Sequence, residues 1–124
     1  MIRTLLLVGL GGGVGSMLRY LTSVLTNRYV HGAFPLGTYI VNIAGCFIIG
    51  WLAGMLGRHS GHTDLHALFI TGFCGGYTTF SAFSAENLRL LQSGNGQTAV
   101  VYILASILAG LFAVWLGMQV SKLT

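Results

Sequence analysis

The sequence has very few charged residues. Six Lys or Arg and two acidic residues, Asp64 and Glu86, make up 6% of its 124 residues, whereas a soluble domain normally has about 25%. With 54% apolar residues and a mean hydropathy of +0.79, the chain has too few polar side chains to cover a surface that faces water. The composition therefore excludes an ordinary soluble protein and predicts a single integral membrane domain over residues 1–124.

Cysteine and proline are also scarce. Cys46 and Cys74 lie in apolar sequence and their spacing indicates neither a disulfide nor a metal site, so we expect them to act as small apolar residues. Pro35, the one proline, stands just before the second long apolar run, where a helix start tolerates it. The first apolar run follows Arg3 and continues past Leu18 without an A-x-A-like cleavage site, which predicts an uncleaved span.

Four segments are apolar enough, and long enough, to cross a bilayer, for which a helix needs about 20 residues. The predicted spans are residues 4–25, 36–56, 65–85 and 98–120. An even number of spans places both termini on the same side of the membrane. The expected fold class is therefore an all-α membrane protein with four transmembrane helices per subunit.

Glycines in these spans recur at four-residue intervals. Such small-xxx-small pairs allow helix backbones to approach closely in lipid. The pairs are Gly9 with Gly13, Gly11 with Gly15, Gly12 with Ser16, and Gly50 with Gly54, while Gly110 stands in the fourth span. A nucleotide-binding loop is not expected, because its glycines must follow a strand and open a helix in a βαβ unit, and none is predicted here.

Positive charges are almost equally divided between the two sides of the predicted domain. Arg3, Arg58 and Lys122 lie on the side of the termini; Arg28 and Arg89 lie on the other side, with Arg19 partway into the first span. The Lys/Arg bias that sets orientation is thus close to zero, and the chain is expected to insert either way round. Four spans also make a thin core. An antiparallel homodimer, with one copy inverted, satisfies both facts; the alternative is that packing or a partner determines one orientation.

The third predicted span is polar in its middle, in the stretch TGFCGGYTTFSAFSAE at residues 71–86. Gly75 and Gly76 weaken the helix near the middle of the membrane, and a break there leaves backbone groups unpaired. Carbonyls at broken helices bind cations in transporters. The sequence therefore predicts a broken third helix, with either a cation held by backbone oxygens between Gly75 and Thr78 or a kink filled by neighbouring side chains.

Polar side chains continue after this break and recur in the other spans. Thr78, Ser81 and Ser84 form a hydroxyl stripe beside Phe80 and Phe83; such stripes are also typical of helix packing and of hydroxyls bonded to their own backbone. The other polar groups are Arg19 in the first span, Thr38 and Asn42 in the second, and Tyr102 and Ser106 in the fourth. Immersed polar groups usually face a cavity or a partner. Most of these are hydrogen-bond donors and no carboxylate lies deep in a span, so they favour a path for a small anion.

Three motifs resemble those of the Fluc/CrcB family of fluoride channels. GFCGGYTTFSAFSAE is similar to that family's third-span pattern, GG-x-[ST]-T-F-S-T-F-S-x-E. GGGVGSMLRY at residues 11–20 and GTYIVNIAG at residues 37–45 resemble its first-span and second-span motifs. The resemblance covers nearly the whole chain. It implies a dual-topology homodimer in the inner (plasma) membrane of the cell, with two antiparallel pores that let toxic fluoride leave passively.

The resemblance also implies roles for particular residues. The implied fluoride pore consists of Asn42, Phe80, Ser81, Phe83, Ser84, Tyr102 and Ser106, with Arg19 drawing anions into a vestibule. The backbone carbonyls of Gly75 and Thr78 from both subunits are implied to hold a structural sodium ion. The chain departs from the family pattern at Ala82, usually Thr, at Gly110, often Ser, and at Tyr77, often aliphatic.

Two other interpretations fit the sequence less well. A small proton-coupled multidrug exporter needs a carboxylate immersed in a span, whereas Glu86 is expected at a helix end, paired with Arg89. A scaffold subunit held together by glycines leaves the hydroxyl stripe unexplained. His62 and His66 have a metal-binding spacing and lie near His59, but histidines in short links are more commonly solvated. No pattern indicates catalysis.

Overall fold

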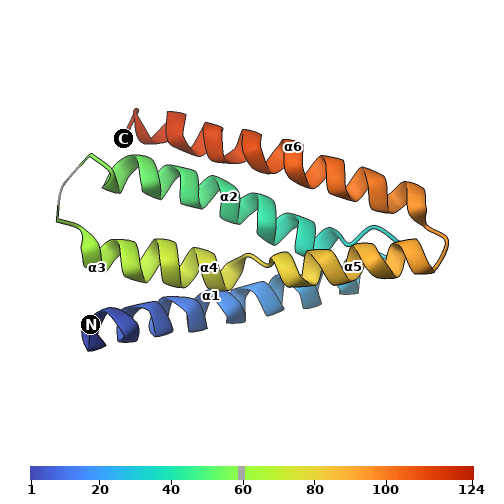
Figure 1. Ribbon diagram of the computed structural model, residues 1–124, viewed down its shortest axis with the longest axis horizontal. Helices are drawn as coiled ribbons and strands as arrows, with labels where there is room; N and C mark the ends of the chain where they lie inside the picture. Colours follow the sequence, from blue (N-terminus) through green and yellow to red (C-terminus); the bar gives the residue numbers. More distant parts are fainter. Residues whose placement is uncertain (59–60) are drawn as a thin grey trace.

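The computed structural model describes residues 1–58 and 61–124, and this part of the chain contains helices and no strands, which confirms the all-helical expectation. The elements are α1 (Ile2–Tyr29), α2 (Leu36–Leu56), α3 (Thr63–Leu65), η1 (His66–Cys74), α4 (Gly75–Tyr77), α5 (Phe80–Gln92) and α6 (Gly96–Ser121). The helices run along the long axis of the molecule, and both termini lie at the same end (Figure 1).

Among the residues that the structure describes, three helices are long and apolar enough to cross a membrane: α1, α2 and α6. The bounds of α2 agree with the predicted span, residues 36–56. The other two extend beyond the predicted apolar segments, since a helix does not stop where the lipid-facing stretch ends. The last turn of α1 includes Arg28, a cation near the negative end of the helix dipole, which favours this extension.

The segment predicted as the third span is divided between several elements. α3, η1 and α4 follow one another through the glycine pair, and η1 is a π-helix of nine residues. Thr78 and Thr79 then have extended backbones, with φ of −88° and −153°, before α5 begins at Phe80. The interruption thus falls at the two threonines. The sequence predicted it at Gly75 and Gly76, and that position is wrong. Glycine weakens a helix but also permits close contact between helices. Gly76 has the second role, because it lies against the backbone of Gly12 on α1.

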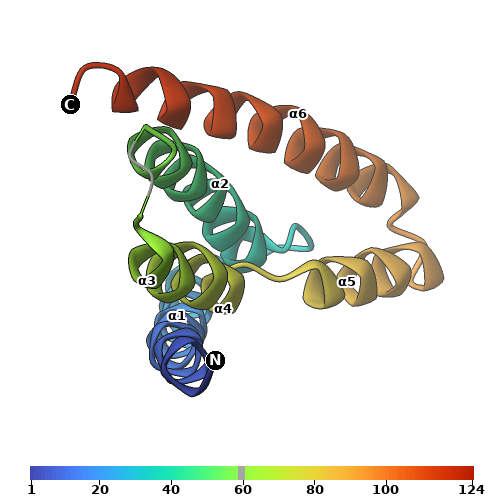
Figure 2. The same ribbon diagram turned by 60° about the vertical axis from the view of Figure 1, so that its left-hand side comes forward.

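Glycines bring the helices together in two pairs. α1 packs along η1 and α4, and α2 packs along α6 (Figures 1 and 2). A Cβ atom built on Gly11 or Gly15 of α1 would overlap a backbone carbonyl oxygen of η1, and one built on Gly50 of α2 would overlap the Val114 carbonyl oxygen of α6. The predicted close approach is therefore confirmed at these positions. Gly9 and Gly13 face open space in the single chain.

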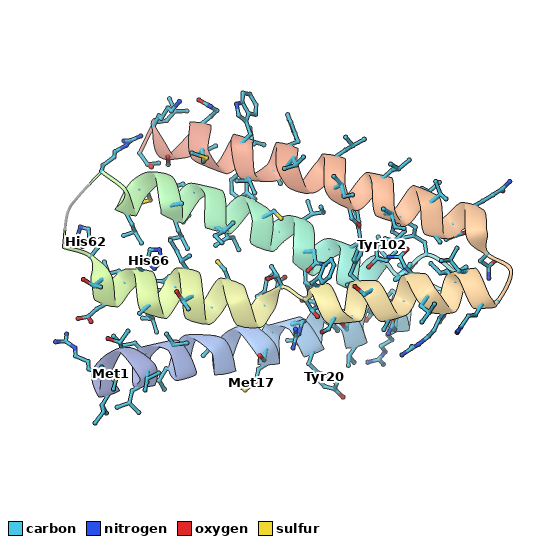
Figure 3. The ribbon with its side chains drawn as sticks, in the orientation of Figure 1. Met1, Met17, Tyr20, His62, His66 and Tyr102 are labelled. Carbon is cyan, nitrogen blue, oxygen red and sulfur yellow. The ribbon has the colours of Figure 1, made fainter. Side chains whose placement is uncertain are left out.

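The outer surface of the helices is largely apolar. Long stretches of α1 and α6 expose Leu, Val, Met and aromatic side chains, and few large side chains are fully buried. Figure 3 shows Met17 and Tyr20 of α1 directed away from the other helices. Such a surface requires a lipid environment, because soluble chains rarely expose apolar patches of this extent. The chain is a multi-pass membrane protein.

Candidate functional site

Asn42 of α2 supports the interruption between α4 and α5. Its Nδ2 donates to the Thr79 carbonyl at 3.1 Å, and its Oδ1 accepts from the Thr79 amide at 2.8 Å. The Thr79 hydroxyl in turn accepts from the Ala82 amide at 3.2 Å and caps α5. The extended backbone of Thr79 is therefore fully hydrogen-bonded, and an unwound segment is stable although it lies in an apolar protein.

Helix α1 supplies donors to carbonyls on the other side of the interruption. The Arg19 Nη1 atom donates to the Thr78 carbonyl at 3.1 Å, and the Ser16 hydroxyl donates to the Gly76 carbonyl at 3.4 Å. In the described part of the chain, no donor from another element reaches the Gly75 carbonyl. Of the two carbonyls predicted to hold sodium, that of Thr78 accepts a hydrogen bond from a guanidinium group. That of Gly75 accepts none from another element of the described chain.

A cavity of about 570 Å³ lies beside the interruption, and we call it the break cavity. It brings together six of the predicted site residues, which are Asn42, Gly75, Thr78, Phe80, Phe83 and Ser106. The Ser106 hydroxyl is buried and has no hydrogen-bond partner among the described residues. Asn42 has a second amide hydrogen, so the residues that line this cavity include two donor groups for which no partner is found in the described part of the chain.

A second cavity, of about 520 Å³, is lined mainly by polar side chains, and we call it the polar cavity. Arg19, Thr38, Ser81 and Glu86 contribute to it. Thr79 lines both cavities, so each of them borders the interruption. The predicted vestibule residue, Arg19, thus lines the polar cavity, whereas Ser106 lines the break cavity.

The hydroxyl and aromatic stripes of α5 are only partly gathered at these cavities. Phe80 and Phe83 both line the break cavity, with their ring centroids 5.9 Å apart, and Phe80 is 79% exposed in the single chain. The Ser81 hydroxyl lies 3.2 Å from that of Thr79. Ser84 lies on the exposed side of α5 and lines neither cavity. Of the predicted pore residues, Ser84 and Tyr102 thus line neither of the two cavities.

Glu86 has partners that the sequence did not indicate. It lies within α5 and not at a helix end, and its carboxylate oxygens accept from the Thr38 hydroxyl at 2.6 Å and the Tyr102 hydroxyl at 2.8 Å. Among the described residues no ion pair joins it to Arg89, which is exposed, so the expected pairing is wrong. Tyr102 is completely buried and lies inside the molecule near α5 (Figure 3). The sequence did contain one indication of a polar contact here, because Thr38 lies one helical turn from Asn42 on α2.

His62 and His66 line neither of these two cavities. His59 is outside the described residues. His62 and His66 lie at the end of the molecule that holds the termini (Figure 3), and the His66 amide donates to the His62 carbonyl at 2.9 Å. No group of three His, Cys, Asp or Glu side chains in residues 1–58 and 61–124 is arranged to hold a metal ion.

Comparison with known proteins gives matches over almost the entire chain. Residues 6–118 match the family described as CrcB-like protein, Camphor Resistance (CrcB). A protein of Flavobacterium psychrophilum named fluoride-specific ion channel FluC is 48% identical over 122 residues, which are 98% of each chain. Proteins with similar names from Azobacteroides pseudotrichonymphae and Brucella melitensis are 49% and 48% identical. These alignments cover 94% of this chain, and 94% and 97% of the two relatives.

Proposed function

Because the chain belongs to the CrcB-like protein family, we propose that it is a fluoride-selective ion channel through which toxic cytoplasmic fluoride leaves the cell passively. The observation that carries this proposal is its similarity, over nearly its full length, to proteins named fluoride-specific ion channels. The donor-rich interruption supports it. The names of the relatives do not support a proton-coupled multidrug exporter.

Permeation requires that the protein replace the water around fluoride. Fluoride is small and strongly hydrated, so its dehydration is favourable only where strong donors take the place of water. Arg19 attracts anions into the polar cavity, and the free amide hydrogen of Asn42 and the hydroxyl of Ser106 stand in the break cavity. The edges of the Phe80 and Phe83 rings carry partial positive charge and can contact a dehydrated anion. The break cavity would therefore stabilise a small anion with uncharged donors and ring edges, while the Arg19 guanidinium lines the polar cavity.

Export needs no coupled energy source. A negative-inside membrane potential drives an anion outward by about 2.3 kcal/mol per charge per 100 mV. The same driving force acts on chloride, so the channel must exclude chloride to avoid depolarising the membrane. The channel therefore needs selectivity and no energy coupling, which agrees with a break cavity lined by uncharged donors and aromatic rings.

A structural sodium ion is the second part of the proposal. Gly75 lines the break cavity, and its carbonyl receives no donor from another element of the described chain. The Thr78 carbonyl accepts one hydrogen bond from Arg19, and its oxygen has a second lone pair. These two carbonyls fit a sodium ligand set. When bound, the ion would neutralise the negative ends of backbone dipoles at the interrupted helix.

The assembly we propose is an antiparallel homodimer, in which α3, η1, α4 and α5 together form an interrupted third span of a single four-span domain. If both orientations are inserted, a single cysteine introduced at Lys122 will be labelled by a membrane-impermeant maleimide in about half of the molecules in intact cells. Labelling after permeabilisation gives the total, and Cys46 and Cys74 in the spans are the background control. Labelling of all or none of the molecules would contradict dual topology.

Fluoride release from proteoliposomes tests the function itself. Purified protein in vesicles loaded with potassium fluoride should release fluoride to an ion-selective electrode once valinomycin allows potassium to follow, with no proton gradient present. Vesicles loaded with potassium chloride should release no chloride above the protein-free control. Absence of fluoride release, equal release of chloride, or strict dependence on a proton gradient would each contradict the proposal.

A further inference from the structure

Four ring contacts connect the break cavity to the link between α1 and α2. The centroid of Phe83 lies 5.9 Å from that of Phe80 and 5.0 Å from that of Tyr102. Tyr102 lies 5.2 Å from Phe34, which lies 5.5 Å from Tyr39. The last three contacts are edge-to-face, a favoured geometry for aromatic pairs. Phe80 and Phe83, which line the break cavity, are therefore the last two members of a continuous series of contacting rings.

Tyr102 is held in place at the centre of this series. Its side chain has no exposed surface, and its hydroxyl donates to Glu86 at 2.8 Å. It forms a buried cluster with Leu90 and Ala99. Phe34 and Phe83, which are far apart in the sequence, both pack against this cluster. A movement of Phe34 would therefore be transmitted to Phe83 through a ring that has no free space of its own.

The backbone of the link holds Phe34 in one position. Pro35 has φ of −76° and ψ of 71°, and the Leu36 amide donates to the Phe34 carbonyl at 2.8 Å, which together define an inverse γ-turn. The proline also restricts the backbone of Phe34, the residue before it, to extended conformations. The single proline of the chain thus restricts the backbone that carries the half-buried Phe34 ring just before α2.

We propose that Phe34 is a positioning residue of the pore, which through Tyr102 holds the Phe83 ring in its orientation at the break cavity. This inference rests on the proposed fluoride function. Phe34 contacts no part of the break cavity itself, since it is absent from its lining. Its effect is on the ring that a dehydrated anion would meet.

The test compares variants of Phe34 in the proteoliposome assay, with fluoride and chloride release measured in parallel. Phe34→Leu keeps an apolar side chain but removes the ring contacts to Tyr39 and Tyr102, and the fluoride rate is expected to fall about tenfold. The ratio of fluoride to chloride release should fall as well. Phe34→Tyr keeps the ring and should retain the wild-type rate and ratio. Phe112→Leu, on the exposed face of α6, is the matched control and should be unchanged.

Each outcome decides between the proposals. A wild-type rate and ratio in Phe34→Leu, or equal losses in Phe34→Tyr or Phe112→Leu, would overturn the positioning role while leaving the channel function intact. If wild-type protein released no fluoride, the proposed function would fail and this inference with it. If Phe34→Leu does not elute as a single folded species in gel filtration, Phe34→Met, an apolar side chain without a ring, takes its place with the same expectations.

Discussion

Replacing Asn42 with Ala is expected to lower the rate of fluoride release by about 100-fold or more. The substitution removes the donor and the acceptor that pair with the backbone of Thr79, and it removes the free amide hydrogen in the break cavity. Each backbone group left unpaired in an apolar environment costs about 1–3 kcal/mol, and 1.4 kcal/mol corresponds to a factor of ten. The measurement is the initial rate of fluoride release from proteoliposomes at equal protein density.

Two further variants separate this effect from a general loss of an amide. Asn42→Asp keeps the acceptor for the Thr79 amide but replaces the donors with a negative charge, so it should fold better than Asn42→Ala and still not conduct. Asn95→Ala alters an exposed asparagine in the link between α5 and α6, which bonds to Ser93, and should conduct normally. A near-normal rate in Asn42→Ala would show that neither the interruption nor permeation depends on this amide.

Replacing Gly15 with Ala is expected to destabilise the protein by about 3 kcal/mol. The new methyl group would overlap the Phe73 carbonyl oxygen and lie 2.8 Å from the Tyr77 amide nitrogen, so α1 would have to move away from η1 and α4. Overpacking of a tight contact typically costs about 1–3 kcal/mol, and here the neighbours are backbone atoms that cannot change rotamer. The midpoint of unfolding in a denaturing detergent, compared with wild type, measures the change.

Gly13→Ala is the matched control for this prediction. Gly13 lies on the same helix and has nothing within 4 Å of the position that a Cβ atom would occupy. Alanine also has a higher helix propensity than glycine, so the unfolding midpoint should stay the same or rise. Equal destabilisation by the two substitutions would mean that the contact between α1 and η1 does not limit stability, or that a second copy of the chain covers Gly13.

The amino-acid sequence by itself determined the class of protein, the bounds of α2 and several of the places where helices approach, among them Gly11, Gly15 and Gly50. Charge content and hydropathy depend on composition, and small-residue spacing depends on neighbours four residues apart, so no knowledge of the fold is needed for either. The motifs around Arg19, Asn42 and the TTFSAFS stretch similarly indicated the family, because a motif is a property of adjacent positions.

Only the tertiary structure decided where the third segment is interrupted and which groups pair there. Helix propensity pointed to Gly75 and Gly76, but the chain unwinds at Thr78 and Thr79, whose backbone groups bond to Arg19 and Asn42 from other helices. Glu86 bonds to Thr38 and Tyr102 and not to nearby Arg89, for the same reason. These partners are between 16 and 59 residues apart in the chain. Propensity and periodicity describe local backbone preferences, whereas a buried polar group is satisfied by whatever donor or acceptor the packing of helices brings to it.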